Sequence, residues 1–280
     1  MEAWERSVAA AKRAGDTLLA LRTEADLTGT LLLSEAPVSE IVRRCEGLLE
    51  AARSTTDRGP VLMALASALV LDGQSARAGD LFAECLAIEH ELGLEIWEAQ
   101  DRILFAYTLL AVGELRTADE MLGAAEHIFE RTGDRLGQPS AAALCALARC
   151  RLGCDEDIDR LLTAAQAAAP SDIAGQAQWR MAVAAAEKLR DGDREYAERL
   201  ALEAVDRLET TEGPLEQAEA YVVLADVLAW QGRREPARAA LLQARERYTR
   251  KGATAAVARV DRLVDEALDY PGSVHPRADA

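Results

Sequence analysis

Apolar residues recur along the chain at the spacing of a helix face, and short breaks interrupt this spacing at regular intervals. In the stretch QGRREPARAALLQARERYTRKG, residues 231–252, Ala237, Leu241 and Ala244 share one helix face between two glycines. Glycine adopts a positive φ at no steric cost and therefore ends helices readily. The sequence contains no alternating apolar pattern of the kind that predicts β-strands. The pattern predicts a chain of helices of similar length.

The glycine at position 232 belongs to a series with a period of about 40 residues. Periods of roughly 20–50 residues indicate stacked repeats. Small side chains let paired helices approach to about 8–10 Å. The fold class predicted is all-α, a right-handed α-solenoid of stacked antiparallel helix pairs. The series is Gly73, Gly113, Gly153, Gly192 and Gly232, at intervals of 40, 40, 39 and 40 residues; seven residues before each stand Ala66, Ala106, Ala146, Ala185 and Ala225.

The breaks divide the chain into five parts. We expect an unpaired N-terminal helix in residues 1–15, a divergent helical hairpin in 16–54, five hairpins in 55–252, a C-terminal capping helix in 253–270 and a disordered tail in 271–280. The capping helix is expected to carry Arg259, Arg262, Asp265 and Glu266 on its exposed face. A terminal repeat is normally complete and polar outside. The unpaired first helix therefore indicates either the end piece of a longer array or association with a second copy.

The repeated Ala/Leu, Gly, Ala, Phe/Leu and Ala spacing resembles the tetratricopeptide repeat (TPR), whose usual period is about 34 residues. Three segments are similar to the C-terminal repeats of large bacterial signalling ATPases, some of which carry a nucleotide-cyclase domain: residues 35–49, 171–205 and 224–252. The chain has no G-x-x-x-x-G-K-[ST] phosphate loop and no cyclase domain. The resemblance implies a sensing or docking segment of such a regulator, with its ATPase or cyclase domains as partners, in cis or in trans.

Charge and composition exclude several classes of partner. The formal net charge is −16, and an acidic surface repels the phosphates of nucleic acids. The longest uncharged apolar run, at 61–71, is shorter than the ~20 residues that span a bilayer. Five cysteines without a secretory signal do not indicate a disulfide framework. We expect a cytoplasmic protein that binds neither nucleic acid nor membranes.

No motif for catalysis or metal binding is complete. His90 begins an H-E-x-x-H pattern, but Leu94 stands where the second histidine is needed. Cys145 and Cys150 fall on different faces of one helix, and Cys154 falls in the following turn, so these thiols do not converge. We expect no enzyme activity, no cofactor and no metal. An enzymatic or small-molecule pocket inside the superhelix remains an alternative, because a fold does not exclude chemistry.

The first helices of the pairs are expected to line a concave surface. Its candidate binding residues are Gln100, Tyr107, Trp179, Glu219 and Asp226. Aromatic side chains are favoured at binding hot spots, although Tyr107 and Trp179 could instead fill gaps between hairpins. The surface is apolar with acids and lacks a Lys/Arg clamp for a terminal carboxylate. We therefore predict a non-catalytic scaffold or sensor that binds a protein or peptide of apolar and basic character, or alternatively a self-assembly module.

Overall fold

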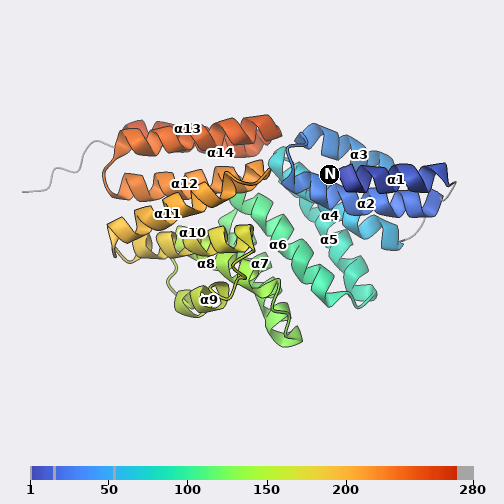
Figure 1. The fold of residues 1–280 in the computed structure, drawn as a ribbon, viewed down its shortest axis with the longest axis horizontal. Helices are drawn as coiled ribbons and strands as arrows, with labels where there is room; N and C mark the ends of the chain where they lie inside the picture. Colours follow the sequence, from blue (N-terminus) through green and yellow to red (C-terminus); the bar gives the residue numbers. More distant parts are fainter. Residues whose placement is uncertain (1, 15–16, 53–54, 270–280) are drawn as a thin grey trace, which may run out of the picture.

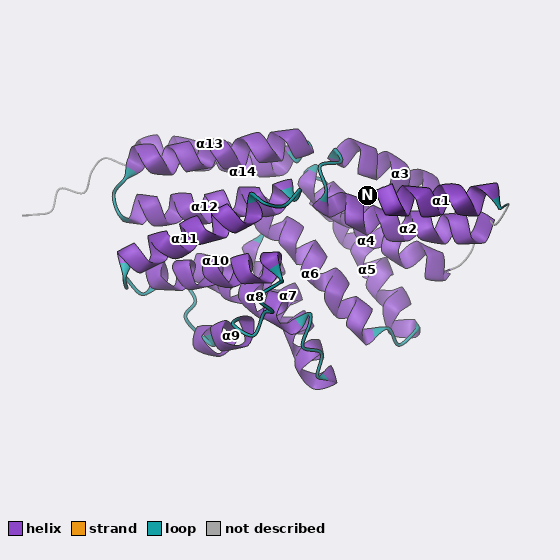
Figure 2. Ribbon diagram, in the orientation of Figure 1, coloured by secondary structure: helices purple, strands orange, loops and turns teal. Residues whose placement is uncertain are grey.

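A computed structural model describes residues 2–14, 17–52 and 55–269, and these residues form fourteen helices and no strand (Figure 2). The predicted disordered tail at 271–280 lies outside the described residues. The helices are α1 (Glu2–Arg13), α2 (Thr17–Leu33), α3 (Val38–Ala51), α4 (Thr55–Leu71), α5 (Ser75–Glu91), α6 (Glu95–Val112), α7 (Leu115–Thr132), α8 (Gln138–Leu152), α9 (Ile158–Ala165), α10 (Ile173–Leu189), α11 (Arg194–Leu208), α12 (Pro214–Trp230), α13 (Arg234–Lys251) and α14 (Thr254–Asp269).

Consecutive helices pack in pairs, which confirms the predicted α-solenoid class (Figure 1). The pairs are α4 with α5, α6 with α7, α8 with α9, α10 with α11, and α12 with α13. Each first helix also contacts the first helix of the next pair. Ala66, Ala106, Ala146 and Ala225 are buried, and Ala185 is half-buried against the core. Small side chains at these positions let neighbouring helices approach closely.

The turns within the pairs use left-handed backbone where the glycine series predicts it, with one exception. Gly73, Gly113, Gly153 and Gly232 have φ values of 84°, 89°, 74° and 78°. In the α10–α11 pair Asp191 takes this conformation instead, with a φ of 49°. Helix α10 ends at Leu189, so the turn falls one residue before Gly192. An aspartate tolerates the left-handed region better than most side chains.

The C-terminal end of the helix array returns to its N-terminal end (Figure 1). Helix α14 packs against α13 and also contacts α4 and α6, and α12 contacts α2. The ammonium nitrogen of Lys251 donates to the carbonyl oxygens of Leu31, at 2.9 Å, and Ser34, at 2.6 Å. A cation at a helix C-terminus pairs with carbonyls that have no partner within the helix. Lys251 therefore fastens the end of α13 to the end of α2.

A second basic residue fastens α14 to the interior. One guanidinium nitrogen of Arg259, Nη1, donates to the carbonyl oxygens of Leu110, at 3.0 Å, and Ala111, at 3.1 Å, at the end of α6. It also donates to the Glu219 carboxylate, at 2.9 Å. The expectation that Arg259 lies on the exposed face of the capping helix is therefore wrong. The physical reason is that the carbonyls ending α6 need donors, and Arg259 supplies them.

One continuous apolar core runs from α2 to α14. Within the described part of the chain, no helix has both the length and the apolar character that crossing a membrane requires.

Candidate functional site

Two of the five predicted binding residues are enclosed in the interior. Tyr107 and Glu219 are buried, and the Tyr248 hydroxyl donates to the Glu219 carboxylate. The expectation of an open concave surface does not hold at these two positions: Tyr107 lies in the apolar core, and helix α14 covers Glu219 through Arg259.

The other three predicted residues are scattered. Asp226 pairs with Lys188 at 3.6 Å and borders a cavity of about 620 Å³ between the ends of α6, α8, α10 and α12 and helix α14. Trp179 is half-buried against the core, with the guanidinium of Arg180 5.3 Å from its ring centroid. Gln100 is exposed on α6. The structure therefore does not bring these three side chains together as one surface, and their role in binding stays a prediction.

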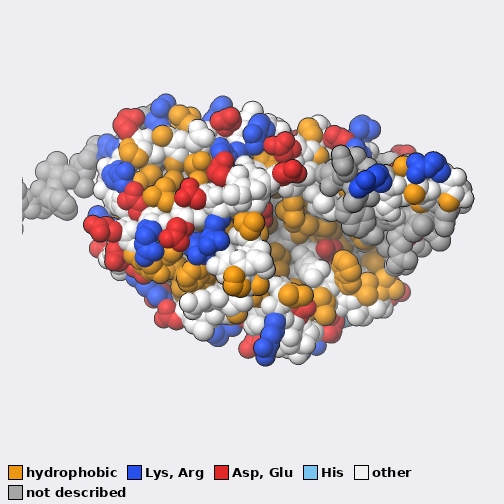
Figure 3. All heavy atoms as spheres, viewed as in Figure 1, with side chains coloured by type: hydrophobic (Ala, Val, Ile, Leu, Met, Phe, Trp, Pro, Cys, Tyr) orange, Lys and Arg blue, Asp and Glu red, His pale blue; other side chains and the backbone are white. Residues whose placement is uncertain are grey.

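A different hollow offers an open apolar surface. It lies between α2, α4, α5 and α6, holds about 680 Å³ and is called the α2–α6 groove below. Hydrophobic side chains gather around it on the face shown in Figure 3. Its apolar lining includes Leu33, Met63, Leu92, Leu94, Trp97 and Leu104.

The turn between α5 and α6 supplies the exposed wall of this groove. Leu92 is the C-cap of α5, Gly93 turns the chain with a φ of 68°, and Trp97 lies in the first turn of α6. Trp97 is 59% exposed and Leu92 is 44% exposed. Single exposed apolar residues are ordinary, whereas a contiguous apolar hollow marks a binding surface.

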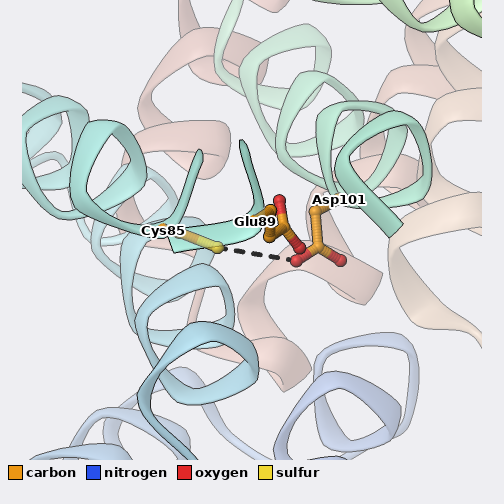
Figure 4. Close-up of side chains that lie close together, drawn as sticks. All are labelled: Cys85, Glu89 and Asp101. Atoms are coloured by element: carbon orange, nitrogen blue, oxygen red, sulfur yellow. Dashed lines mark hydrogen bonds between the residues drawn. The ribbon is translucent and has the colours of Figure 1, made fainter. Parts of the chain in front are cut away.

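The floor of the groove carries two carboxyl groups, Glu89 and Asp101, with the buried thiol of Cys85 beside them (Figure 4). Cys85 and Glu89 are one helical turn apart on α5, and Asp101 comes from α6. The single hydrogen of the Cys85 thiol has two acceptors within reach, a carboxylate oxygen of Asp101 at 3.6 Å and the Gly59 carbonyl at 3.3 Å. One ligand atom from each of Cys85, Glu89 and Asp101 lies within 4.8 Å of the others. Within the described chain, these three residues are the group that could hold a metal ion.

Burial raises the pKa of all three side chains, Cys85, Glu89 and Asp101. Burial, together with the neighbouring Asp101 carboxylate, raises the pKa of Glu89 to about 9. Burial raises the pKa of Asp101 to about 6, and burial raises the pKa of the Cys85 thiol well above its usual range. At neutral pH the three groups together therefore carry about one negative charge, most of it on Asp101. An entering cation would meet this charge and could displace the remaining protons.

From the sequence, Cys85 is expected to be a buried stand-in for alanine, and neither acid is identified as a site residue. Cys85 is fully buried, so that interpretation of its position is confirmed. The two acids can be compared with the residues at the same positions in the other repeats. Glu89 lies sixteen residues after its glycine, where the other repeats have Phe129, Ala169, Leu208 and Tyr248. Asp101 lies twelve residues before its glycine, where other repeats have Val61, Ala141, Arg180 and Ala220.

Comparison with known proteins identifies no relative: no family model matches the chain, and no curated protein matches it. The resemblance to TPR regions of signalling ATPases, and the partners it implies, therefore stay predictions.

Proposed function

We propose that this chain is a non-catalytic recognition module that binds a segment of a partner protein in the α2–α6 groove. The observation that carries this proposal is the open apolar hollow formed by Leu33, Leu92 and Trp97 above a floor that holds Asp101. The resemblance to repeat regions of bacterial regulators favours a scaffold or sensor role of the same kind.

The chemistry of the groove favours one kind of occupant, a segment with large apolar side chains and at least one Lys or Arg. Fully burying a leucine-sized side chain contributes about 1.5–3 kcal/mol. Trp97 and Leu92 can therefore act as the anchors that dominate such an interface. The floor carries negative charge on Asp101, and the net charge of −16 attracts basic segments to the molecule. An amphipathic helix laid in a groove of helices is a recurrent mode of recognition.

The cysteines support a location for this activity. All five are free, and four of them are buried. Free thiols without disulfides fit the reducing conditions of the cytoplasm, where we propose that the module works.

The test is a titration of the protein into two fluorescently labelled amphipathic peptides of equal length, followed by anisotropy. One peptide is built from leucine and lysine, and the other has glutamate in place of lysine. We expect the lysine peptide to bind at least tenfold more tightly. Trp97→Ala and Leu92→Ala should each weaken its binding about tenfold, since each removes roughly 1–3 kcal/mol of apolar contact. These variants keep the net charge, so a purely electrostatic association would not respond to them.

Leu136→Ala is the matched control, because Leu136 is 87% exposed and lies outside the groove. Equal losses in Leu136→Ala and Trp97→Ala would contradict the proposal. So would tighter binding of the glutamate peptide, or no binding of the lysine peptide. A dimer that Trp97→Ala dissociates would assign the groove to a second copy of the chain instead.

A further inference from the structure

We propose that Cys85, Glu89 and Asp101 form a binding site for a single Zn²⁺ ion at the floor of the α2–α6 groove (Figure 4). This site goes beyond partner recognition, because a metal can bind there whatever segment occupies the groove. Two features support it: the separations of the three donors and an unpartnered buried oxygen.

The donor separations fit the ion. A Zn–S bond of about 2.3 Å and a Zn–O bond of about 2.1 Å at a tetrahedral angle place sulfur and oxygen about 3.6 Å apart. The Cys85 Sγ and Asp101 Oδ2 atoms are 3.6 Å apart. The third donor comes from Glu89, and the three donor atoms lie within 4.8 Å of one another. A small rotation of the Glu89 side chain would bring one of its carboxylate oxygens to the ion. The three donors would then occupy three of the four tetrahedral positions.

One oxygen of the buried Glu89 carboxyl group lacks a partner. Glu89 is only 5% exposed, and its Oε2 atom has no hydrogen-bond partner within the described residues. The Glu89 carboxyl group hydrogen-bonds to Asp101, and Arg102, whose positive charge acts on Glu89, is bonded to Glu98 at 2.7 Å. A buried polar atom without a partner is costly and indicates a missing ligand, ion or water. Figure 4 shows Glu89 and Asp101 directed toward each other beside Cys85.

Zinc binds the deprotonated forms of cysteine, glutamate and aspartate side chains, so its binding displaces any protons that these three side chains hold.

The donor set selects the type of ion. A thiolate is a soft ligand that suits zinc, whereas Mg²⁺ and Ca²⁺ need oxygen ligands in larger numbers. Glu89 and Asp101 border the groove and Cys85 does not, so the fourth coordination position opens toward the groove. Water occupies such an open position in zinc sites with three protein ligands.

The test uses Co²⁺ as a spectroscopic substitute for Zn²⁺ in the full chain, reduced and stripped of metal with a chelator. We expect one equivalent of Co²⁺ to give a thiolate-to-cobalt charge-transfer band, which Zn²⁺ then abolishes by displacement. The displacement gives the zinc affinity.

Substitutions test whether the metal binds at Cys85, Glu89 and Asp101 or at another thiol of the chain. Cys85→Ala should abolish the band, and the fold should tolerate it because alanine stands at this register position in Ala125, Ala165, Ala204 and Ala244. Glu89→Gln and Asp101→Asn should each weaken zinc binding at least tenfold. Cys154→Ala is the control and should keep the band, since Cys154 is the half-exposed thiol near Asp155 and Asp157.

Two outcomes would overturn the proposal. The first is the absence of a charge-transfer band in the wild-type protein, which depends on no variant folding correctly. The second is a band that Cys154→Ala removes and Cys85→Ala leaves in place. Loss of peptide binding with an intact metal site would instead contradict only the proposed recognition function, so the two failures are distinguishable.

Discussion

Replacement of Glu219 by glutamine should destabilise the protein more than any single change at its surface. Glu219 on α12 is 1% exposed and accepts hydrogen bonds from Arg151 Nη1, at 2.7 Å, Arg259 Nη1, at 2.9 Å, and the Tyr248 hydroxyl. These donors come from α8, α14 and α13. Removing the charge leaves two buried guanidinium groups without their shared partner, which costs about 3–5 kcal/mol.

The pKa of Glu219 gives a second, independent magnitude. Burial alone would raise this pKa, but Arg151 and Arg259 outweigh burial and lower it from 4.5 to about 2. A tenfold change in an ionisation constant corresponds to about 1.4 kcal/mol, so the ionised form contributes roughly 3 kcal/mol to stability. Because the folded-state pKa is lowered, this contribution is complete above about pH 5 and is lost as the pH falls from 4.5 toward 2.

Urea unfolding followed by far-UV circular dichroism measures both effects. The difference in unfolding free energy between wild type and Glu219→Gln should be about 3 kcal/mol at pH 7 and should shrink below about pH 4.5. Glu198→Gln is the control, because the Glu198–Arg233 ion pair is partly exposed and contributes about 1 kcal/mol or less. A loss at Glu219 no larger than at Glu198, or a difference that does not change with acid, would refute the reasoning.

Three further changes test other parts of the structure. Burial lowers the pKa of Lys251 to about 7, so the stability of wild type relative to Lys251→Met should rise by up to about 1.4 kcal/mol per pH unit from pH 7 to 10; a flat difference would contradict this. Gly113→Ala should lower the unfolding free energy by about 1–2 kcal/mol, because φ is 89° and a Cβ would lie 3.2 Å from Arg259. Gly47→Ala should raise it slightly, because Gly47 lies within a helix and a Cβ there would have no neighbour within 4 Å. Glu89→Leu should raise stability by about 1–3 kcal/mol and abolish cobalt binding, since it removes an unpartnered buried oxygen; a destabilised variant would indicate that Glu89 supports the fold.

The repeat of the fold was predictable because it depends on short-range features. Short stretches of sequence determine where each helix lies and where it ends. Small residues such as Ala106 and left-handed turns such as Gly113 recur along the sequence. The return of the C-terminal end to the N-terminal end was not predictable. Lys251 donates to the Leu31 carbonyl, 220 residues away in sequence. Every residue has a backbone carbonyl, so no sequence pattern indicates which one a lysine will contact.

The candidate site was only partly predictable, for a related reason. The expected character of the partner, apolar and basic, was inferred from the apolar and acidic residues predicted for the concave surface, and it stays a prediction. The enclosure of Glu219 was not predictable, because the concave surface was expected to stay open, whereas Arg259 joins α14 to the end of α6. Glu89 and Asp101 were missed because neither forms a motif alone; Glu89 departs from apolar residues at its position in the other repeats, and Asp101 stands at a position that also holds Arg180.

Glu219 and Glu89 are both buried acids, but they differ in the positive charges that surround them. Glu219 has its compensating charges within the chain, in Arg151 and Arg259, and burial there joins four helices into one structure. The partners of Glu89 are weaker: it hydrogen-bonds to Asp101, and Arg102, whose positive charge acts on it, is bonded to Glu98. Burial keeps the proton on Glu89 beside a groove that is open to solvent. The proposed metal ion at Cys85, Glu89 and Asp101, or a basic side chain above them, would supply a positive partner from outside the chain.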